Sequence, residues 1–469
     1  MSARLRRLVA CAVITTAATP AAASAAWTRP VDLTAPARSI VAPELAYWPD
    51  GTALVTWRGR PRSARDGERA LTNVATLGTD GRRTTLLAAR EQIVARPYGR
   101  RSLALLRQRT DPSDDTVLRL SAALGTRTRG ASRMQTIARS SPDTRIQPNP
   151  SLAVRDDGET AVAWAELRDQ PRRAVVRLAV RPAGGRFGRP ATVAAGRRGT
   201  SVGPSAPVVA HGPDGELLVA YSTARIVDDG QVGSVAVRTR SPRGTLGRPT
   251  TLGPAGVGGL PSLAVGTSGR AAVAWSSRGS LIDHVYIRAA VHPARRRSFL
   301  PAQVLDLDSD RALSGHVAIA IAPDGTATLA WGGPEGREAR VATAGADGRF
   351  GGITRLGQGF HPDVAVRPDG TTVVAFRTSV LPALPGPGFP APAQRIVAYL
   401  RPAHALDFLP LEFVSSLEAP AAASDIEPHV AFAGPRGRAT VLWPAAALGG
   451  QPLQRLADTA VLRLATRSP

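Results

Sequence analysis

The chain has 469 residues, one cysteine and a formal net charge of +23. The sequence contains 59 arginines and no lysine, and the arginines are scattered along the chain rather than gathered in one run. A single cysteine excludes an internal disulfide and a multi-thiolate metal site, and scattered arginine predicts general attraction to anions without a specific nucleic-acid site.

Residues 1–26 have the features of a secretory signal peptide. Three arginines precede a short apolar run, and small residues follow up to Trp27. We therefore predict cleavage that leaves Ala26 or Trp27 first, with the mature protein secreted or held in the cell envelope. Two alternatives stay open: an uncleaved membrane anchor, and a lipid on Cys11 within a lipobox-like segment. No later segment has the length and hydropathy of a membrane-spanning helix.

One pattern recurs along the rest of the chain, and PSLAVRDDGETAVAW at residues 150–164 is its clearest copy. An apolar run meets a turn, often Asp-Gly, and a second apolar run ends in an aromatic residue six positions after the glycine. The seven pairs are Gly51 and Trp57, Gly158 and Trp164, Gly215 and Tyr221, Gly269 and Trp275, Gly325 and Trp331, Gly370 and Phe376, and Gly437 and Trp443.

Each copy predicts a β-hairpin, because glycine accepts the positive φ that such a turn requires. Two further alternating runs follow the aromatic residue, so the unit is four short antiparallel strands without helical periodicity. The recurrent aromatic is interpreted as packing between units rather than as a ligand-stacking ring. The aspartates of the turns are interpreted as turn-forming residues.

The spacing of the aromatics leaves room for an eighth, degenerate copy at residues 91–138, with Leu105 in place of the aromatic. The chain after the signal is then one domain, residues 27–469, with units that start near residues 43, 91, 150, 207, 261, 316, 362 and 428. Repeats of this length with four strands are typical of β-propeller blades. We predict an all-β propeller of eight blades, or of seven if the degenerate copy is not a blade.

The ends of the chain predict how the ring closes. The last copy has three strands, the third at residues 459–466, whereas Arg29–Leu33 resembles an isolated fourth strand. If the two segments pair, the last blade is completed and two open sheet edges disappear.

The pattern resembles the repeat-built propellers of exported bacterial proteins, and it is distantly similar to the sialidase-like (BNR) and WD40-like superfamilies. The sialidase Asp-box has the form S-x-D-x-G-x-x-W, whereas here Asp and Gly are adjacent and the aromatic comes six residues after the glycine. No Arg-Ile-Pro segment occurs, so the resemblance implies the fold and transfers no catalytic residue.

Two groups of residues are candidates for a binding site. Asp306, Asp308 and Asp310 alternate as calcium ligands can, although the glycine and glutamate of an EF-hand loop are missing, and an ordinary polar loop is the alternative. His316, His361 and His429 fall near the start of the first strand of a unit. They therefore lie where a propeller lines its central channel. Apart from calcium at the three aspartates, no cofactor is expected.

These observations favour an exported, monomeric, non-enzymatic propeller that binds a glycan, an anionic polymer or a protein. Whether it has any catalytic activity stays open: a carbohydrate-active enzyme of sialidase-like architecture would require two carboxylates, or a Tyr/Glu pair with arginines, that converge on the variable face. A purely structural surface protein is the third alternative. The connections after the second and the fourth strand vary most in length, and both open on one face, where we expect the site.

Overall fold

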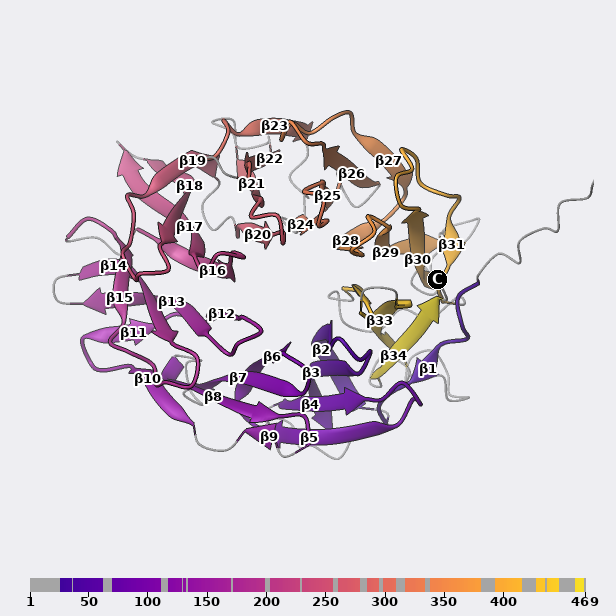
Figure 1. The fold of residues 1–469 in the computed structure, drawn as a ribbon, viewed down its shortest axis with the longest axis horizontal. Helices are drawn as coiled ribbons and strands as arrows, with labels where there is room; N and C mark the ends of the chain where they lie inside the picture. Colours follow the sequence, from indigo (N-terminus) through magenta and orange to yellow (C-terminus); the bar gives the residue numbers. More distant parts are fainter. Residues whose placement is uncertain are drawn as a thin grey trace, which may run out of the picture.

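The protein is a ring of β-sheets around a central opening (Figure 1). The computed structural model describes residues 26–35, 37–61, 70–110, 117–128, 130–131, 134–169, 172–198, 203–227, 230–255, 260–278, 285–294, 298–308, 317–333, 338–380, 393–415, 427–434, 437–446 and 460–467. Among these residues, no helix is long and apolar enough to cross a membrane.

The strands form eight blades, and in each blade they follow one another outward from the central opening. Blade 1 contains β2 (Ala37–Tyr47), β3 (Ala53–Pro61), β4 (Leu71–Leu77) and β5 (Arg83–Ala89); blade 2 contains β6 (Gln92–Tyr98), β7 (Ser102–Thr110), β8 (Val117–Thr126) and β10 (Gln135–Arg139). Blade 3 contains β12 (Ser151–Val154), β13 (Thr160–Asp169), β14 (Arg172–Arg181) and β15 (Ala191–Ala195); blade 4 contains β16 (Ser205–His211), β17 (Leu217–Val227), β18 (Gly230–Arg240) and β19 (Thr250–Ala255).

The second half of the ring repeats this order. Blade 5 contains β20 (Ser262–Val265), β21 (Ala271–Arg278), β22 (Val285–His292) and β23 (Gln303–Asp308); blade 6 contains β24 (Val317–Ile321), β25 (Ala327–Gly332), β26 (Ala339–Ala344) and β27 (Thr354–Gly357). Blade 7 contains β28 (Phe360–Val366), β29 (Thr372–Val380), β30 (Ala393–Arg401) and β31 (Glu412–Phe413); blade 8 contains β32 (His429–Phe432), β33 (Ala439–Ala446), β34 (Ala460–Arg467) and β1 (Val31–Asp32).

The predicted count of eight blades is confirmed, and the degenerate copy forms blade 2. Leu105 of this blade packs against blade 1, in one cluster with Leu54 and Val74. Two short strands were not predicted from the repeat: β9 (Gly130–Ala131) and β11 (Thr144–Ile146). Because β11 pairs with both β8 and β13, it joins blades 2 and 3 into one sheet.

The ring closes as predicted, because β1 pairs antiparallel with β34 (Figure 1). Val31 lies opposite Leu464, and Asp32 lies opposite Arg463, whose Nε donates to the Asp32 carboxylate at 2.7 Å. Backbone bonds extend the contact on both sides of β1, from Thr28 N to Thr466 O and from Leu33 N to Leu462 O. A further pair, Ala37 with Ala460, connects blade 8 directly to blade 1.

The turn between the first two strands is nearly uniform. Six of the seven predicted glycines have positive φ: Gly51, Gly158, Gly215, Gly269, Gly325 and Gly370. In blade 8 the glycine with positive φ is Gly434 rather than Gly437, because this turn is one residue longer. Several turn aspartates accept a hydrogen bond from the backbone N–H two residues later, as Asp157 does from Glu159 at 2.9 Å. This bond stabilises the turn locally.

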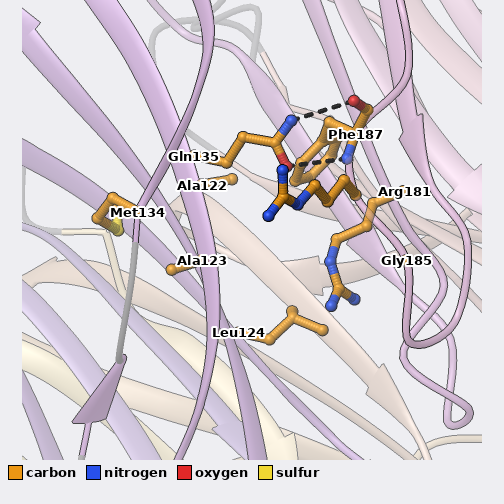
Figure 2. A pocket seen from close by; sticks show the side chains of 9 residues that line it. Ala122, Ala123, Leu124, Met134, Gln135, Arg181, Gly185 and Phe187 are labelled. Carbon is orange, nitrogen blue, oxygen red and sulfur yellow. Dashed lines mark hydrogen bonds between the residues drawn. The ribbon is translucent and has the colours of Figure 1, made fainter.

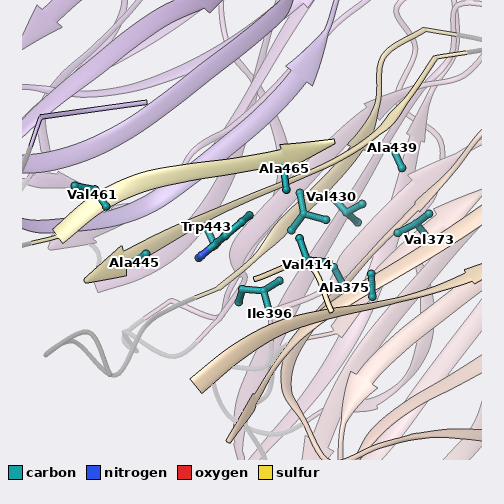
Figure 3. Packing of buried hydrophobic residues seen from close by; sticks show 12 residues of the cluster. Val373, Ala375, Ile396, Val414, Val430, Ala439, Trp443, Ala445, Val461 and Ala465 are labelled. Carbon is teal, nitrogen blue, oxygen red and sulfur yellow. The ribbon is translucent and has the colours of Figure 1, made fainter. Parts of the chain in front are cut away.

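Apolar side chains from neighbouring blades form the core. All seven recurrent aromatics are buried, and each packs toward the blade that precedes it in the ring. Figure 3 shows the example of Trp443, which lies in a cluster with Val373, Ala375 and Ile396 of blade 7. Large rings that are buried once per blade supply much of the apolar area between blades.

A glutamine clamp joins two pairs of blades at their outer strands. In Figure 2, Gln135 of blade 2 accepts a hydrogen bond from Phe187 N at 3.0 Å and donates one to Phe187 O at 3.1 Å. Gln303 of blade 5 makes the same two bonds with Phe350 of blade 6. The side-chain amide thus pairs with the backbone as another strand would, beside a pocket of about 380 Å³.

We expect Gln135→Met to lower the free energy of unfolding by about 2 kcal/mol, because both half-buried backbone groups of Phe187 lose their partner. Denaturant titration followed by fluorescence measures this change. Gln147→Met is the matched control, since Gln147 is exposed and its side chain makes no bond with another described residue. Equal stability of the two variants would show that the clamp contributes nothing.

Candidate functional site

Several blades begin with an unusual backbone conformation at a residue that precedes proline. Ala42, Asn149, Ala206 and His361 have φ angles of 48°, 66°, 46° and 48°. Positive φ is uncommon outside glycine, and a following proline restricts the backbone further. In β2, β16 and β28 the pairing with the next strand shifts at this point. Such a bulge re-aims the side chains beside it, and in β28 these are His361 and Asp363.

The side chain directly after the proline reaches the next blade. Asp363 Oδ2 of blade 7 accepts a hydrogen bond from Val430 N of blade 8 at 2.9 Å. Ser151 Oγ of blade 3 accepts one from Val209 N of blade 4 at 3.1 Å. Hydrogen bonds of this kind fix the side chain, so the groups at the start of the innermost strands are held by two blades at once.

Six titratable side chains lie on or directly beside the innermost strands of blades 7, 8, 1 and 2, which are consecutive in the ring. We call them the charged array: Glu44, Arg96, His361, Asp363, Glu427 and His429. Glu44 Oε2 of β2 lies 2.6 Å from Arg96 Nη1 of β6. Burial opposes ionisation of Glu44, but Arg96 outweighs it and holds the pKa of the carboxyl below its usual value.

Two pairs cross between blades 7 and 8. His361 Nδ1 of β28 lies 3.4 Å from Glu427 Oε1 beside β32, and His429 Nδ1 of β32 lies 3.7 Å from Asp363 Oδ2 of β28. All four side chains are half-buried. Hydrogen-bond donors and acceptors therefore alternate over four neighbouring blades, in positions that are fixed and still reached by solvent.

The predicted calcium ligands are only partly described. Asp306 Oδ2 accepts hydrogen bonds from Trp331 Nε1 at 2.8 Å and from Arg340 Nη1 at 2.5 Å, so this carboxylate connects blade 5 to blade 6. The side chain of Asp308 and all of Asp310 lie outside the described residues. Within the part of the chain that is described, no three His, Cys, Asp or Glu side chains gather as metal ligands do. Calcium at the three aspartates stays an untested prediction.

Of the three predicted channel histidines, the structure brings His361 and His429 to neighbouring blades, and each faces a carboxylate of the other blade. His316 lies outside the described residues. Of the long connections expected to carry the site, residues 62–69 and 381–392 also fall outside them, whereas residues 139–149 are described. The charged array lies where the connections between blades enter the innermost strands, and thus at the end of the ring predicted for the site.

Four members of the charged array were not predicted from the sequence: Glu44, Arg96, Asp363 and Glu427. Three of them had a signal: each adjoins the proline with which a unit begins, as in Pro43-Glu44, Pro362-Asp363 and Glu427-Pro428. Arg96 had no such sequence signal, because its position in the degenerate copy has no counterpart among the clear copies.

Comparison with known proteins gave no match to a protein-family profile and none to a curated protein. Among solved structures, an α-L-arabinofuranosidase of Fusarium graminearum is 11% identical, with a TM-score of 0.38, and the match covers 80% of this chain and 96% of that one. An α-L-arabinanase of Penicillium chrysogenum is 13% identical, with a TM-score of 0.39, and the match covers 75% of this chain and 93% of that one. Trypanosoma rangeli sialidase is 11% identical, with a TM-score of 0.34, and the match covers 92% of this chain and 55% of that one. The activities in these names belong to those proteins.

Proposed function

We propose that the chain is an exported, non-enzymatic binding propeller, and that the charged array is its contact site for a glycan. The observation that carries this proposal is the alternation of fixed donors and acceptors over blades 7, 8, 1 and 2. A sugar presents hydroxyl groups that both donate and accept, so an alternating rim complements it without a large net charge. Bonds that involve an ionised partner are the stronger ones in such a contact.

The state of the Glu44 carboxylate supports binding rather than glycan hydrolysis. Most glycosidases require one carboxylic acid that stays protonated and delivers its proton to the leaving group. Glu44 is instead held ionised beside Arg96. Asp363 accepts hydrogen bonds from Val364 N and Val430 N, both at 2.9 Å, so both of its oxygens already have a backbone donor. Ionised carboxylates accept bonds from sugar hydroxyls and have no proton to donate.

Export is proposed from the amino-terminal sequence. Cleavage before Ala26 or Trp27 would leave the closing strand β1 on the mature chain, together with the backbone bridge between Trp27 and Arg467. Sequencing the amino terminus of the protein recovered outside the cytoplasm tests this, and a retained Met1 or a lipid on Cys11 would contradict the predicted cleavage.

The binding proposal is tested by screening the intact protein on an array of oligosaccharides and measuring the best hit by titration calorimetry. The variant E44Q/D363N keeps the shape of both side chains and removes two charged acceptors. We expect it to bind about tenfold more weakly, because hydrogen bonds to charged groups are the stronger ones.

The matched control is D214N/D407N. Both of these aspartates are exposed, and neither makes an ion pair with another described residue, so this variant should bind as the parent does. The proposed site would be contradicted if both double variants lost affinity for the oligosaccharide equally, or if the parent bound no oligosaccharide. Appearance of new reducing ends during incubation with the best hit would show instead that the protein is a glycan-cleaving enzyme.

A further inference from the structure

A second cavity lies at the seam where the ring closes, between blades 8 and 1. It has a volume of about 960 Å³. Its walls come from the segment around β1, from the turns β2–β3 and β4–β5 of blade 1, and from the turn β32–β33 of blade 8. These turns open on the face opposite to the charged array, so the cavity, here called the seam cleft, is a separate site.

The body of the seam cleft is apolar. Val31, Tyr47, Leu77 and Leu464 line it, together with prolyl, alanyl and glycyl groups of the turns. The Tyr47 hydroxyl donates to Thr440 Oγ1 at 2.7 Å and so connects blade 1 to blade 8. Burial raises the pKa of Tyr47 to about 12, and its ring therefore remains a neutral part of the wall. Clefts of several hundred Å³ with mainly apolar walls are typical of sites for small organic molecules.

Two arginines on different segments give the cleft its charge. Arg29 precedes β1 and Arg438 precedes β33; both are exposed, and neither forms an ion pair with another described residue. Two aspartates also line the cleft. Asp50 is already paired with Arg127, whereas Asp80 receives a hydrogen bond from Arg82 N at 2.9 Å. The cleft is thus lined by two guanidinium groups and by one carboxylate, Asp80, that have no ion-pair partner among the described side chains. Its unpaired charge is therefore positive.

From this arrangement we infer that the seam cleft binds an organic anion with an apolar body. The apolar walls accept the body, and Arg29 and Arg438 bind the anionic group at the rim. Guanidinium groups suit carboxylates and sulfonates because they offer several parallel N–H donors. Fatty acids and aryl acids share this chemistry. The inference rests on the seam cleft alone and is independent of glycan binding at the charged array.

The probe is anilinonaphthalene sulfonate, whose fluorescence rises in an apolar site, and its uncharged analogue is phenylnaphthylamine. We expect one saturable site for the sulfonate on the intact monomer, with affinity that falls as salt is added. The variant R29Q/R438Q should bind the sulfonate about tenfold more weakly and phenylnaphthylamine unchanged. Dodecanoate and naphthoate then compete as aliphatic and aryl anions, and displacement by either one identifies the class of ligand.

The matched control is R189Q/R248Q, which removes the same charge at two exposed arginines outside the cleft. A second variant, Val31→Glu, places a negative charge on the wall at a residue that is 58% exposed, and it should abolish sulfonate binding without unfolding the ring. The inference is overturned if the two arginine pairs give equal affinities, if V31E binds as the parent does, or if neither acid displaces the probe.

Discussion

A chain that starts at Thr34, and therefore lacks Trp27–Leu33, is expected to melt about 5 °C below a chain that starts at Trp27 and to associate in solution. The deletion removes β1 and its backbone bonds to β34. It also removes the Asp32 carboxylate from Arg463, whose side chain is only 7% exposed. Asp32 is 50% exposed, so loss of this ion pair costs about 1 kcal/mol, and the lost strand pairing adds to it.

Association is expected because β34 then presents its outer edge to solvent. An unpaired edge offers a row of backbone donors and acceptors to another chain. Calorimetry gives the melting temperature, and size-exclusion chromatography with light scattering gives the mass.

The control for this deletion removes residues 384–390, a stretch of equal length between β29 and β30 that lies outside the described residues. Loops tolerate deletion better than strands do, so this variant should stay close to the parent. A finer variant, D32N, removes only the charge, and its melting temperature should lie between those of the parent and the deletion. An unchanged melting temperature and a monomeric mass for the chain from Thr34 would show that β1 is dispensable for closure.

The second large effect is expected from pH. His211 ends β16, and its side chain is 7% exposed. Burial lowers its pKa to about 4, with a further contribution from Arg155 that Asp157 partly opposes; Arg240 acts in the same direction as Arg155. Glu159 Oε1 lies 3.8 Å from its Nδ1. The folded protein therefore holds this imidazole neutral, whereas the unfolded chain protonates it near pH 6.5.

Because the folded state binds the proton less readily, the stability that this group contributes is complete above about pH 6.5 and is lost as the pH falls toward 4. The loss amounts to about 3 kcal/mol. His211→Leu should melt as the parent does at pH 7.5 and clearly above it at pH 4.5. His404→Asn is the control, since His404 is exposed and asparagine tolerates its φ of 61°. Parallel pH profiles of the parent and H211L would refute the proposed role of burial.

Much of the fold follows from local chemistry. A glycine with positive φ and an aromatic six residues later define a hairpin that buries a ring against its neighbour, and this holds even in blade 2, where Leu105 packs instead. The turn of blade 8 was misassigned because an inserted residue moved the left-handed position to Gly434 while Gly437 kept the offset. Strand β11 was missed because three residues that bridge two sheets have no periodicity to detect.

The charged array was harder to predict because it is made between blades. Asp363 and His429 are far apart in the sequence and meet only when two innermost strands lie side by side. Their position beside a unit's first proline was visible, but the repeat pattern emphasised the glycine and the aromatic. The seam cleft had no sequence signal, since its walls combine the start of the chain with turns from its first and last blades.

The pairing of β1 with β34 also decides when the protein can finish folding. Synthesis runs from the amino terminus, so Val31 is made more than 430 residues before its partner Leu464. Strand β1 therefore stays unpaired until β34 has been made. The contact that completes the ring joins two segments that are far apart in the sequence. Contacts of such separation carry a large loop-closure entropy and form slowly. Ring closure is thus expected to be a slow, late step of folding, and it begins only after Leu464 has been synthesised.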